Sequence, residues 1–151
     1  MLARPFNVIR KLLGGARWAF EATIMLAAAR FLIKFVPFRY WRKWLGDVAE
    51  SSGPFHQNEK LDPDRARFVG IWVRRAAGKV PFDAVCLPQA MAGRWMLKRR
   101  GLAGRITIGA RANDDDRNAL FHAWLMHGDQ CLTGQHERDT YKAFVRSEPQ
   151  S

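Results

Sequence analysis

Residues 120–135 read Leu120-Phe-His-Ala-Trp-Leu-Met-His-Gly-Asp-Gln-Cys-Leu-Thr-Gly-Gln135, and this stretch decides the fold class. It predicts two strands, 120–127 and 130–135, which pair as a hairpin through a Gly128-Asp129 turn. Upstream, Arg105-Ile-Thr-Ile-Gly-Ala110 alternates with a period of two and predicts another strand. We therefore expect an antiparallel sheet of three or more strands in the C-terminal part of the chain.

Helical patterns fill the chain before this sheet. Pro37 ends the first pattern and Gly78 ends the third. Because helices come first and an antiparallel sheet follows, the sequence predicts an α+β domain. The expected helices span residues 5–36, with a break at Gly14-Gly15, then 38–50, 62–77 and 86–100.

Three segments are expected along the 151 residues, which are enough for one ordinary domain. Residues 1–60 read as a hydrophobic and basic helical lead-in that ends in a polar linker. Residues 61–146 read as the core of the domain, and residues 147–151 as a tail. We expect Tyr141 and Phe144 to dock on the sheet just before this tail.

The composition excludes several classes of protein. Hydrophobic residues make up 48% of the chain, too many for a disordered protein, and two cysteines cannot form a disulfide framework. The 25 Lys and Arg residues outnumber the 14 Asp and Glu residues, which gives a formal net charge of +11. Such an excess favours an acidic partner, namely a nucleic acid, a membrane surface or an acidic peptide.

Charged residues interrupt the apolar N-terminal region, where the longest nearby uncharged run is Ala22–Ala29. A membrane span needs roughly 20 apolar residues, so we expect neither a signal peptide nor a span, and a cytoplasmic location. Arg39-Tyr-Trp-Arg-Lys-Trp44 mixes cations with aromatic residues, as membrane-surface segments do, so a peripheral membrane contact through the N-terminal helices stays open. The alternative is that long Arg and Lys stems pack over a hydrophobic helix pair.

Cys86 and His122 are the residues best suited to catalysis. Cys86 opens a predicted helix, where the positive end of the helix dipole favours the thiolate, which is the nucleophilic form. His122 lies within a predicted strand. Papain-like enzymes build their nucleophile and base from a cysteine at a helix start and a histidine on a later strand. Either residue alone is more often structural, so the hypothesis rests on the pair.

Five blocks of sequence occur together around this pair. They are Cys86-Leu-Pro-Gln-Ala-Met-Ala92, Met96-Leu-Lys-Arg-Arg-Gly101, Ile106-Thr-Ile-Gly109, His122-Ala-Trp124 and Leu132-Thr-Gly134. In this combination the chain resembles the transglutaminase-like leader peptidases of lasso-peptide biosynthesis. With the helical lead-in, the resemblance covers about residues 20–146. It implies a papain- or transglutaminase-like core in which helices pack on a small antiparallel sheet.

The resemblance implies a cysteine peptidase that cuts the leader from a ribosomally made precursor peptide. Cys86 would attack the scissile carbonyl and form a thioester, with His122 as the base, and we expect no cofactor. The implied partners are the precursor peptide, a leader-binding protein and an asparagine-synthetase-like macrolactam cyclase. Because residues 1–60 do not resemble a small winged-helix module, we expect the leader-binding protein to be a separate chain.

The family pattern has an Asp after the histidine, and here the nearest downstream Asp is Asp129. The predicted hairpin register puts His122 opposite Gln135 and leaves Asp129 roughly 20 Å away. Gln135 could therefore accept a hydrogen bond from the imidazole through its amide oxygen, as Asn does in papain-like enzymes. The alternatives are that the orienting residue is one of Asp114–Asp116, or that it is missing.

Other functions compete with this hypothesis. A zinc site could use His122, His127, Cys131 and His136, but a spacing of five puts His122 and His127 on opposite faces of a regular strand, so we expect no metal. A non-enzymatic protein that binds nucleic acid or a membrane surface would use the basic excess, yet no nucleic-acid recognition motif accompanies it. Acyl transfer by a true transglutaminase would use the same Cys86–His122 pair. In each enzymatic case Cys131 reads as a bystander on its strand.

Overall fold

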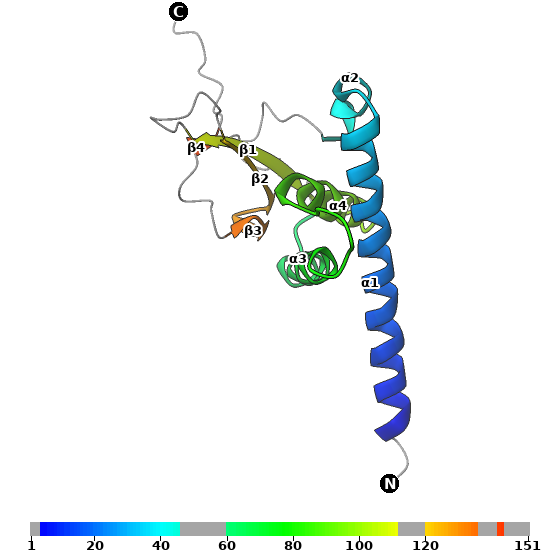
Figure 1. The fold of residues 1–151 in the computed structure, drawn as a ribbon. Helices are drawn as coiled ribbons and strands as arrows, with labels where there is room; N and C mark the ends of the chain where they lie inside the picture. The colour runs from blue at the N-terminus through cyan, green and yellow to red at the C-terminus, as the bar shows by residue number, and fades with distance from the viewer. Residues whose placement is uncertain (1–3, 46–59, 112–119, 136–141, 144–151) are drawn as a thin grey trace, which may run out of the picture.

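The computed structural model describes residues 4–45, 60–111, 120–135 and 142–143, and the helices precede the sheet along the chain (Figure 1). The order confirms the predicted α+β class. The elements are α1 (Arg4–Phe35), α2 (Phe38–Trp41), the 3-10 helix η1 (Arg42–Leu45), α3 (Pro63–Ala77), α4 (Cys86–Lys98), β1 (Arg105–Arg111), β2 (Leu120–His127), β3 (Gln130–Thr133) and β4 (Lys142–Ala143).

The first helix, α1, is continuous through Gly14 and Gly15, so the predicted break there is wrong. Glycine weakens a helix interior by roughly 0.5–1 kcal/mol per residue, which tertiary packing can offset. Here a Cβ on Gly15 would lie 3.3 Å from the Trp72 ring of α3, so the helix passes close to its neighbour at this glycine. The second predicted helix, 38–50, is described only as far as Leu45, as α2 and η1.

The ends of α3 and α4 follow the signals in the sequence. The Asp62 carboxylate caps α3 by accepting the Arg65 N–H at 3.1 Å. After α4, Gly101 takes a φ of 66°, and the Leu102 N–H donates to the Leu97 carbonyl at 3.0 Å. This left-handed turn terminates the helix and confirms the predicted stop at Gly101.

The described strands form one antiparallel sheet in the order β3-β2-β1-β4. The predicted hairpin is present, with His127 paired to Gln130. A register shift between Leu125 and Met126 then places Leu125 opposite Thr133, one residue beyond the partner that a regular hairpin gives. Because β3 also ends at Thr133, the prediction that His122 pairs with Gln135 is wrong.

The central element of the fold is α4, which lies between α1 and the sheet (Figure 1). Small side chains allow this close packing on both sides. A Cβ on Gly93 would lie 2.6 Å from Leu125 of β2, and Ala90 and Ala92 are fully buried. Met91 is also fully buried. The position of Cys86 at the start of α4 is therefore fixed by the core of the molecule.

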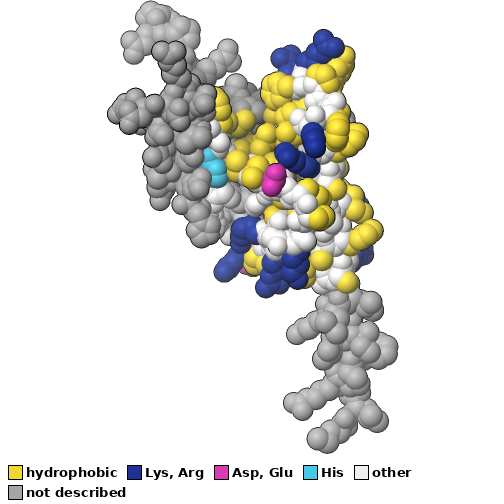
Figure 2. Space-filling model, in the orientation of Figure 1, with side chains coloured by type: hydrophobic (Ala, Val, Ile, Leu, Met, Phe, Trp, Pro, Cys, Tyr) yellow, Lys and Arg dark blue, Asp and Glu magenta, His cyan; other side chains and the backbone are white. Residues whose placement is uncertain are grey.

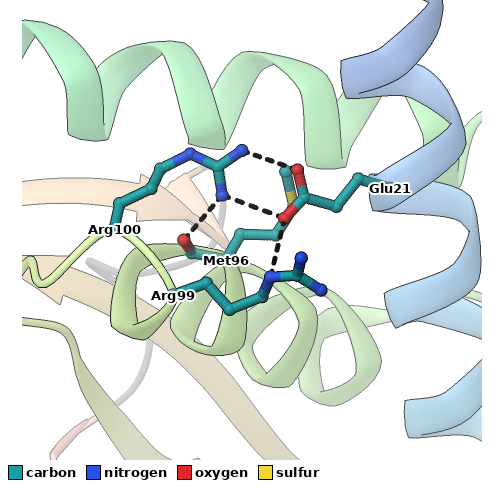
Figure 3. Close-up of polar contacts among 4 residues, drawn as sticks. All are labelled: Glu21, Met96, Arg99 and Arg100. Carbon is teal, nitrogen blue, oxygen red and sulfur yellow. Dashed lines mark hydrogen bonds and ion pairs between the residues drawn. The ribbon is translucent and has the colours of Figure 1, made fainter.

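A polar cluster ties α1 to the end of α4 (Figure 3). The Glu21 carboxylate accepts hydrogen bonds from Arg100 Nη1 at 3.0 Å and Nη2 at 2.6 Å, and Arg99 Nε lies 3.5 Å away. Arg100 also donates to the Met96 carbonyl at 2.8 Å. The hydrogen bond from Arg100, together with the nearby cations, lowers the pKa of Glu21 from its ordinary value of 4.5.

The lead-in and the core share one hydrophobic cluster, in which Leu26 of α1 is fully buried with residues of α3, α4 and the sheet. The domain boundary after residue 60 stays a prediction. Tyr141, Phe144, the acidic residues 114–116 and the tail 147–151 lie outside the described residues. Within the described ranges, no helix has the length and hydropathy needed to cross a membrane.

Candidate active site

Cys86 is the first residue of α4 and is partly exposed. The preceding residue, Val85, is extended, and its carbonyl accepts the first hydrogen bond of the helix, from the Gln89 N–H at 3.3 Å. The backbone N–H of Cys86 comes before the first N–H that is bonded within the helix. Like the first N–H groups of every α-helix, it has no acceptor within the helix. It can therefore donate to a negatively charged oxygen that forms beside the thiol.

His122 lies on β2 and is 9% exposed. Its Nε2 lies 3.1 Å from the carbonyl oxygen of Gly134. A carbonyl oxygen only accepts, so Nε2 carries the proton and donates. In the neutral ring this leaves Nδ1 as the nitrogen that can take up a proton, which is the property required of a general base.

Gly134 makes this contact possible because it has no side chain. Its φ is 77°, in the left-handed region that favours glycine. A Cβ at this position would lie 3.0 Å from His122 Nε2 and 2.9 Å from the carbonyl oxygen of Ala123. The backbone therefore approaches the imidazole closely just after the end of β3.

One cavity of about 730 Å³ brings Cys86 and His122 together. Its walls come from the end of α3, the start of α4, the start of β2 and the chain after β3. The other lining residues are Arg74, Ala77, Gly78, Val85, Gln89, Phe121, Gly134 and Gln135. A thiol and a hydrogen-bonded imidazole therefore line the same cavity.

Gln135, the predicted orienting residue, also lines this cavity. Its side-chain amide nitrogen donates to the carbonyl of Cys131, while the described hydrogen bond of His122 goes to Gly134. Its role as the orienting residue stays a prediction. The acidic alternatives at 114–116 lie outside the described residues.

Among the polar side chains of the cavity, sequence reasoning missed Arg74 and Gln89. Arg74 stands on the last turn of α3 and donates through Nη1 to the carbonyl of Leu132. Gln89 donates to the Ala84 carbonyl at 2.7 Å and so fixes the chain that leads into Cys86. The signal for Gln89 was its place three residues after Cys86, on the same side of the helix. An arginine on a helix surface carries no comparable signal.

The remaining cysteine and histidine candidates lie elsewhere. Cys131 is buried on β3, where its Sγ donates to the Thr133 carbonyl at 3.3 Å. His127 accepts the Asp62 N–H through Nε2 at 2.9 Å, and its Nδ1 lies 2.6 Å from the Ala103 carbonyl. It thereby joins the end of β2 to the start of α3. Among the described residues, no group of three or more His, Cys, Asp or Glu could hold a metal ion.

Comparison with known proteins identifies the family of the chain. The model of the transglutaminase-like superfamily matches residues 32–146, which is more than half of the chain and includes Cys86 and His122. No curated protein and no solved structure shows significant similarity to the chain. On its fold and on this match, the chain belongs to the transglutaminase-like superfamily.

Proposed function

We propose that the protein is a cysteine peptidase that removes the leader from a ribosomally made lasso-peptide precursor. The observation that carries the proposal is that Cys86, at the start of α4, and His122, on β2, line one cavity. The superfamily includes cysteine peptidases and acyltransferases, so a Cys86 nucleophile with a His122 base fits its known activities. The lasso-peptide substrate rests on the five sequence blocks that resemble the leader peptidases.

In the proposed reaction, His122 Nδ1 takes the proton of the Cys86 thiol. The sulfur attacks the carbonyl carbon of the peptide bond between leader and core, and the Cys86 N–H stabilises the oxyanion that forms. When the C–N bond breaks, His122 returns the proton to the leaving amine of the core peptide. Water then hydrolyses the thioester, and the leader leaves as a carboxylic acid.

We assign the orientation of His122 to the backbone carbonyl of Gly134 in this mechanism. A partly buried carbonyl that accepts from Nε2 at 3.1 Å holds the imidazole in one tautomer, as a side-chain amide oxygen would. It carries no full charge, so it stabilises the imidazolium less than an Asp would. Gln135 is the competing assignment. If Gly134 orients the imidazole, substitution of Gly134 should slow the reaction, and if Gln135 does, substitution of Gln135 should.

The proposed partners follow from the same chemistry. The cleaved amine becomes the nucleophile for an asparagine-synthetase-like cyclase that closes the macrolactam ring. A separate leader-binding protein would deliver the precursor to the cavity. Acyl transfer is the alternative outcome of the same thioester, because an amine in place of water would capture the acyl group.

The experiment is a cleavage assay with precursor peptide, leader-binding protein and full-length enzyme, followed by mass spectrometry. We expect Cys86→Ala to slow leader release by about a thousand-fold or more, because the nucleophile is lost. Cys131→Ala is the matched control and keeps most of the activity. In ¹⁸O-labelled water the released leader gains one labelled oxygen.

Two results would contradict the proposal. Undiminished leader release by the Cys86→Ala variant removes the nucleophile from the mechanism. A leader that is recovered as an amide when a primary amine is added, with no free acid, assigns the protein to acyl transfer instead.

A further inference from the structure

The helix α1 carries hydrophobic side chains on two opposite sides. On its inner side Ala22, Leu26 and Ala29 are fully buried in the core. A second hydrophobic row occurs at spacings of four and seven residues, which places it on the other side of the helix. This outer face consists of Phe20, Ile24, Phe31 and Phe35, all exposed. Helices that are hydrophobic all round are normally buried on every side.

The outer face continues beyond the end of α1. The rings of Phe31 and Phe35 lie 5.1 Å apart between centroids, and these residues are 58% and 64% exposed. Phe38 of α2 is exposed as well and packs edge-on against Trp41 at 4.8 Å. A row of exposed aromatic rings of this kind marks a binding surface.

Positive charge accompanies the row, and negative charge is turned away from it. Between residues 1 and 46 the only acidic residue is Glu21, which is bound by Arg99 and Arg100 on the side of α4. Lys34 Nζ lies 5.5 Å from the centroid of the Phe35 ring. Figure 2 shows hydrophobic side chains along α1 with Lys and Arg side chains among them toward α2.

A hollow of about 440 Å³ adjoins the outer face, between α1 and the segment that precedes α4. Phe31, Lys34 and Phe35 line it, so apolar and cationic groups meet in one place. Asp83 is on its other wall and forms an ion pair of 3.6 Å with Arg30, which also lines the hollow. With Arg30 and Lys34 against the one carboxylate of Asp83, the described lining of the hollow has a net positive charge.

We propose that the outer face of α1 binds to the surface of an anionic phospholipid bilayer. The aromatic rings enter the boundary between headgroups and acyl chains, while Lys34 and the basic residues of α2 and η1 contact lipid phosphates. A second copy of the chain fits less well, because it would bring two cationic faces together. Among the described side chains, those that line the cavity of Cys86 include none from α1, so this proposal does not rest on the peptidase activity.

The test is co-sedimentation of the full chain with vesicles. One set contains equal parts of phosphatidylcholine and phosphatidylglycerol, and the other contains phosphatidylcholine alone. We expect binding to the anionic vesicles only, and weaker binding as salt is raised. The double variant Phe31→Ser and Phe35→Ser should bind at least about ten-fold more weakly, because two rings no longer insert.

Phe121→Ser is the matched control, because Phe121 is 63% exposed and lies on β2, away from α1. It should bind like the unaltered chain, and circular dichroism checks that all variants are folded. Equal binding to both vesicle sets, retained binding by the double variant, or equal loss in the Phe121 control would each overturn the proposal. So would a dimer in sedimentation velocity that the double variant abolishes while the vesicles bind nothing.

Discussion

At Gly134 the chain turns with a φ of 77° and presents its carbonyl to the ring of His122. The same residue type at Gly101 has a φ of 66°, but no heavy atom lies within 4 Å of the position of its Cβ. The two glycines therefore share a backbone conformation and differ in what they approach. Comparing alanine variants at the two positions therefore separates the effect of backbone strain from the effect of close contacts, which at Gly134 involve His122, Ala123 and Trp124.

We expect Gly134→Ala and Gly101→Ala each to lower the free energy of unfolding by about 1–3 kcal/mol, because alanine is strained at positive φ. Only Gly134→Ala should also slow the alkylation of Cys86 by iodoacetamide, by about ten-fold, because its methyl group displaces His122. Mass spectrometry of the modified peptide measures the rate. Equal alkylation rates in the two variants would show that the Gly134 carbonyl does not position the base.

The Cys86–His122 pair could be predicted from the sequence, because a helix start and a strand are local patterns and the two side chains carry distinctive chemistry. The Gly134 carbonyl could not, since every residue has one and only the fold decides which carbonyl meets the imidazole. A glycine that ends a strand was its one signal. The register error at Gln135 arises at the irregularity between Leu125 and Met126, which departs from the regular pairing that the turn predicts.

At the scale of elements, α1 is held to α4 by both apolar and polar contacts. The Glu21 carboxylate is mostly buried and receives two hydrogen bonds from Arg100 (Figure 3). Asp83, in contrast, is largely exposed and forms one ion pair with Arg30. Hydrogen bonds to charged groups in such partly buried places contribute more than surface pairs do. We therefore expect the contacts of Glu21 to contribute more to stability than the ion pair of Asp83.

Replacing Glu21 with Gln should lower the free energy of unfolding by about 1–3 kcal/mol, and replacing Asp83 with Asn by less than about 1 kcal/mol. The pKa of Glu21 is lowered in the folded protein, so its contribution is present above 4.5 and is lost as the pH falls through the lowered pKa. Urea unfolding at a series of pH values measures the difference between variant and unaltered chain. A difference that grows toward acid would contradict this assignment.

The helices and strands themselves were largely predictable, because capping residues and hydrophobic period are local signals. Asp62 and Gly101 marked helix ends that the structure confirms. The break at Gly14-Gly15 was wrong because local glycine propensity competes with tertiary contacts, here the approach of Trp72 to Gly15. The exposed outer face of α1 was also beyond prediction, since periodicity alone does not tell which of two apolar sides faces the core.

At the scale of the whole molecule, α1 shares its hydrophobic core with the elements that carry Cys86 and His122. Leu26 is fully buried in the hydrophobic cluster shared by the helices and the sheet, while Phe31 on the same helix is exposed. The family match likewise begins at residue 32, within α1. The lead-in therefore supports the position of α4 and, through it, of Cys86.

Leu26→Ala should lower the free energy of unfolding by about 2–5 kcal/mol, because it leaves a cavity in this shared cluster. Phe31→Ala, on the same helix, should change it by less than about 1 kcal/mol. Both variants should unfold in a single transition, followed by circular dichroism and by tryptophan fluorescence. Separate melting of α1, with the catalytic elements unaffected by Leu26→Ala, would contradict a shared core.

The central claim is that Cys86 is a nucleophile served by His122, and the alkylation rate of Cys86 tests it without any substrate. At neutral pH we expect iodoacetamide to modify Cys86 much faster than the buried Cys131, and His122→Ala to slow Cys86 by about ten-fold or more. Equal rates for the two thiols in the folded protein, or a Cys86 rate that does not change in the folded His122→Ala variant, would contradict the account.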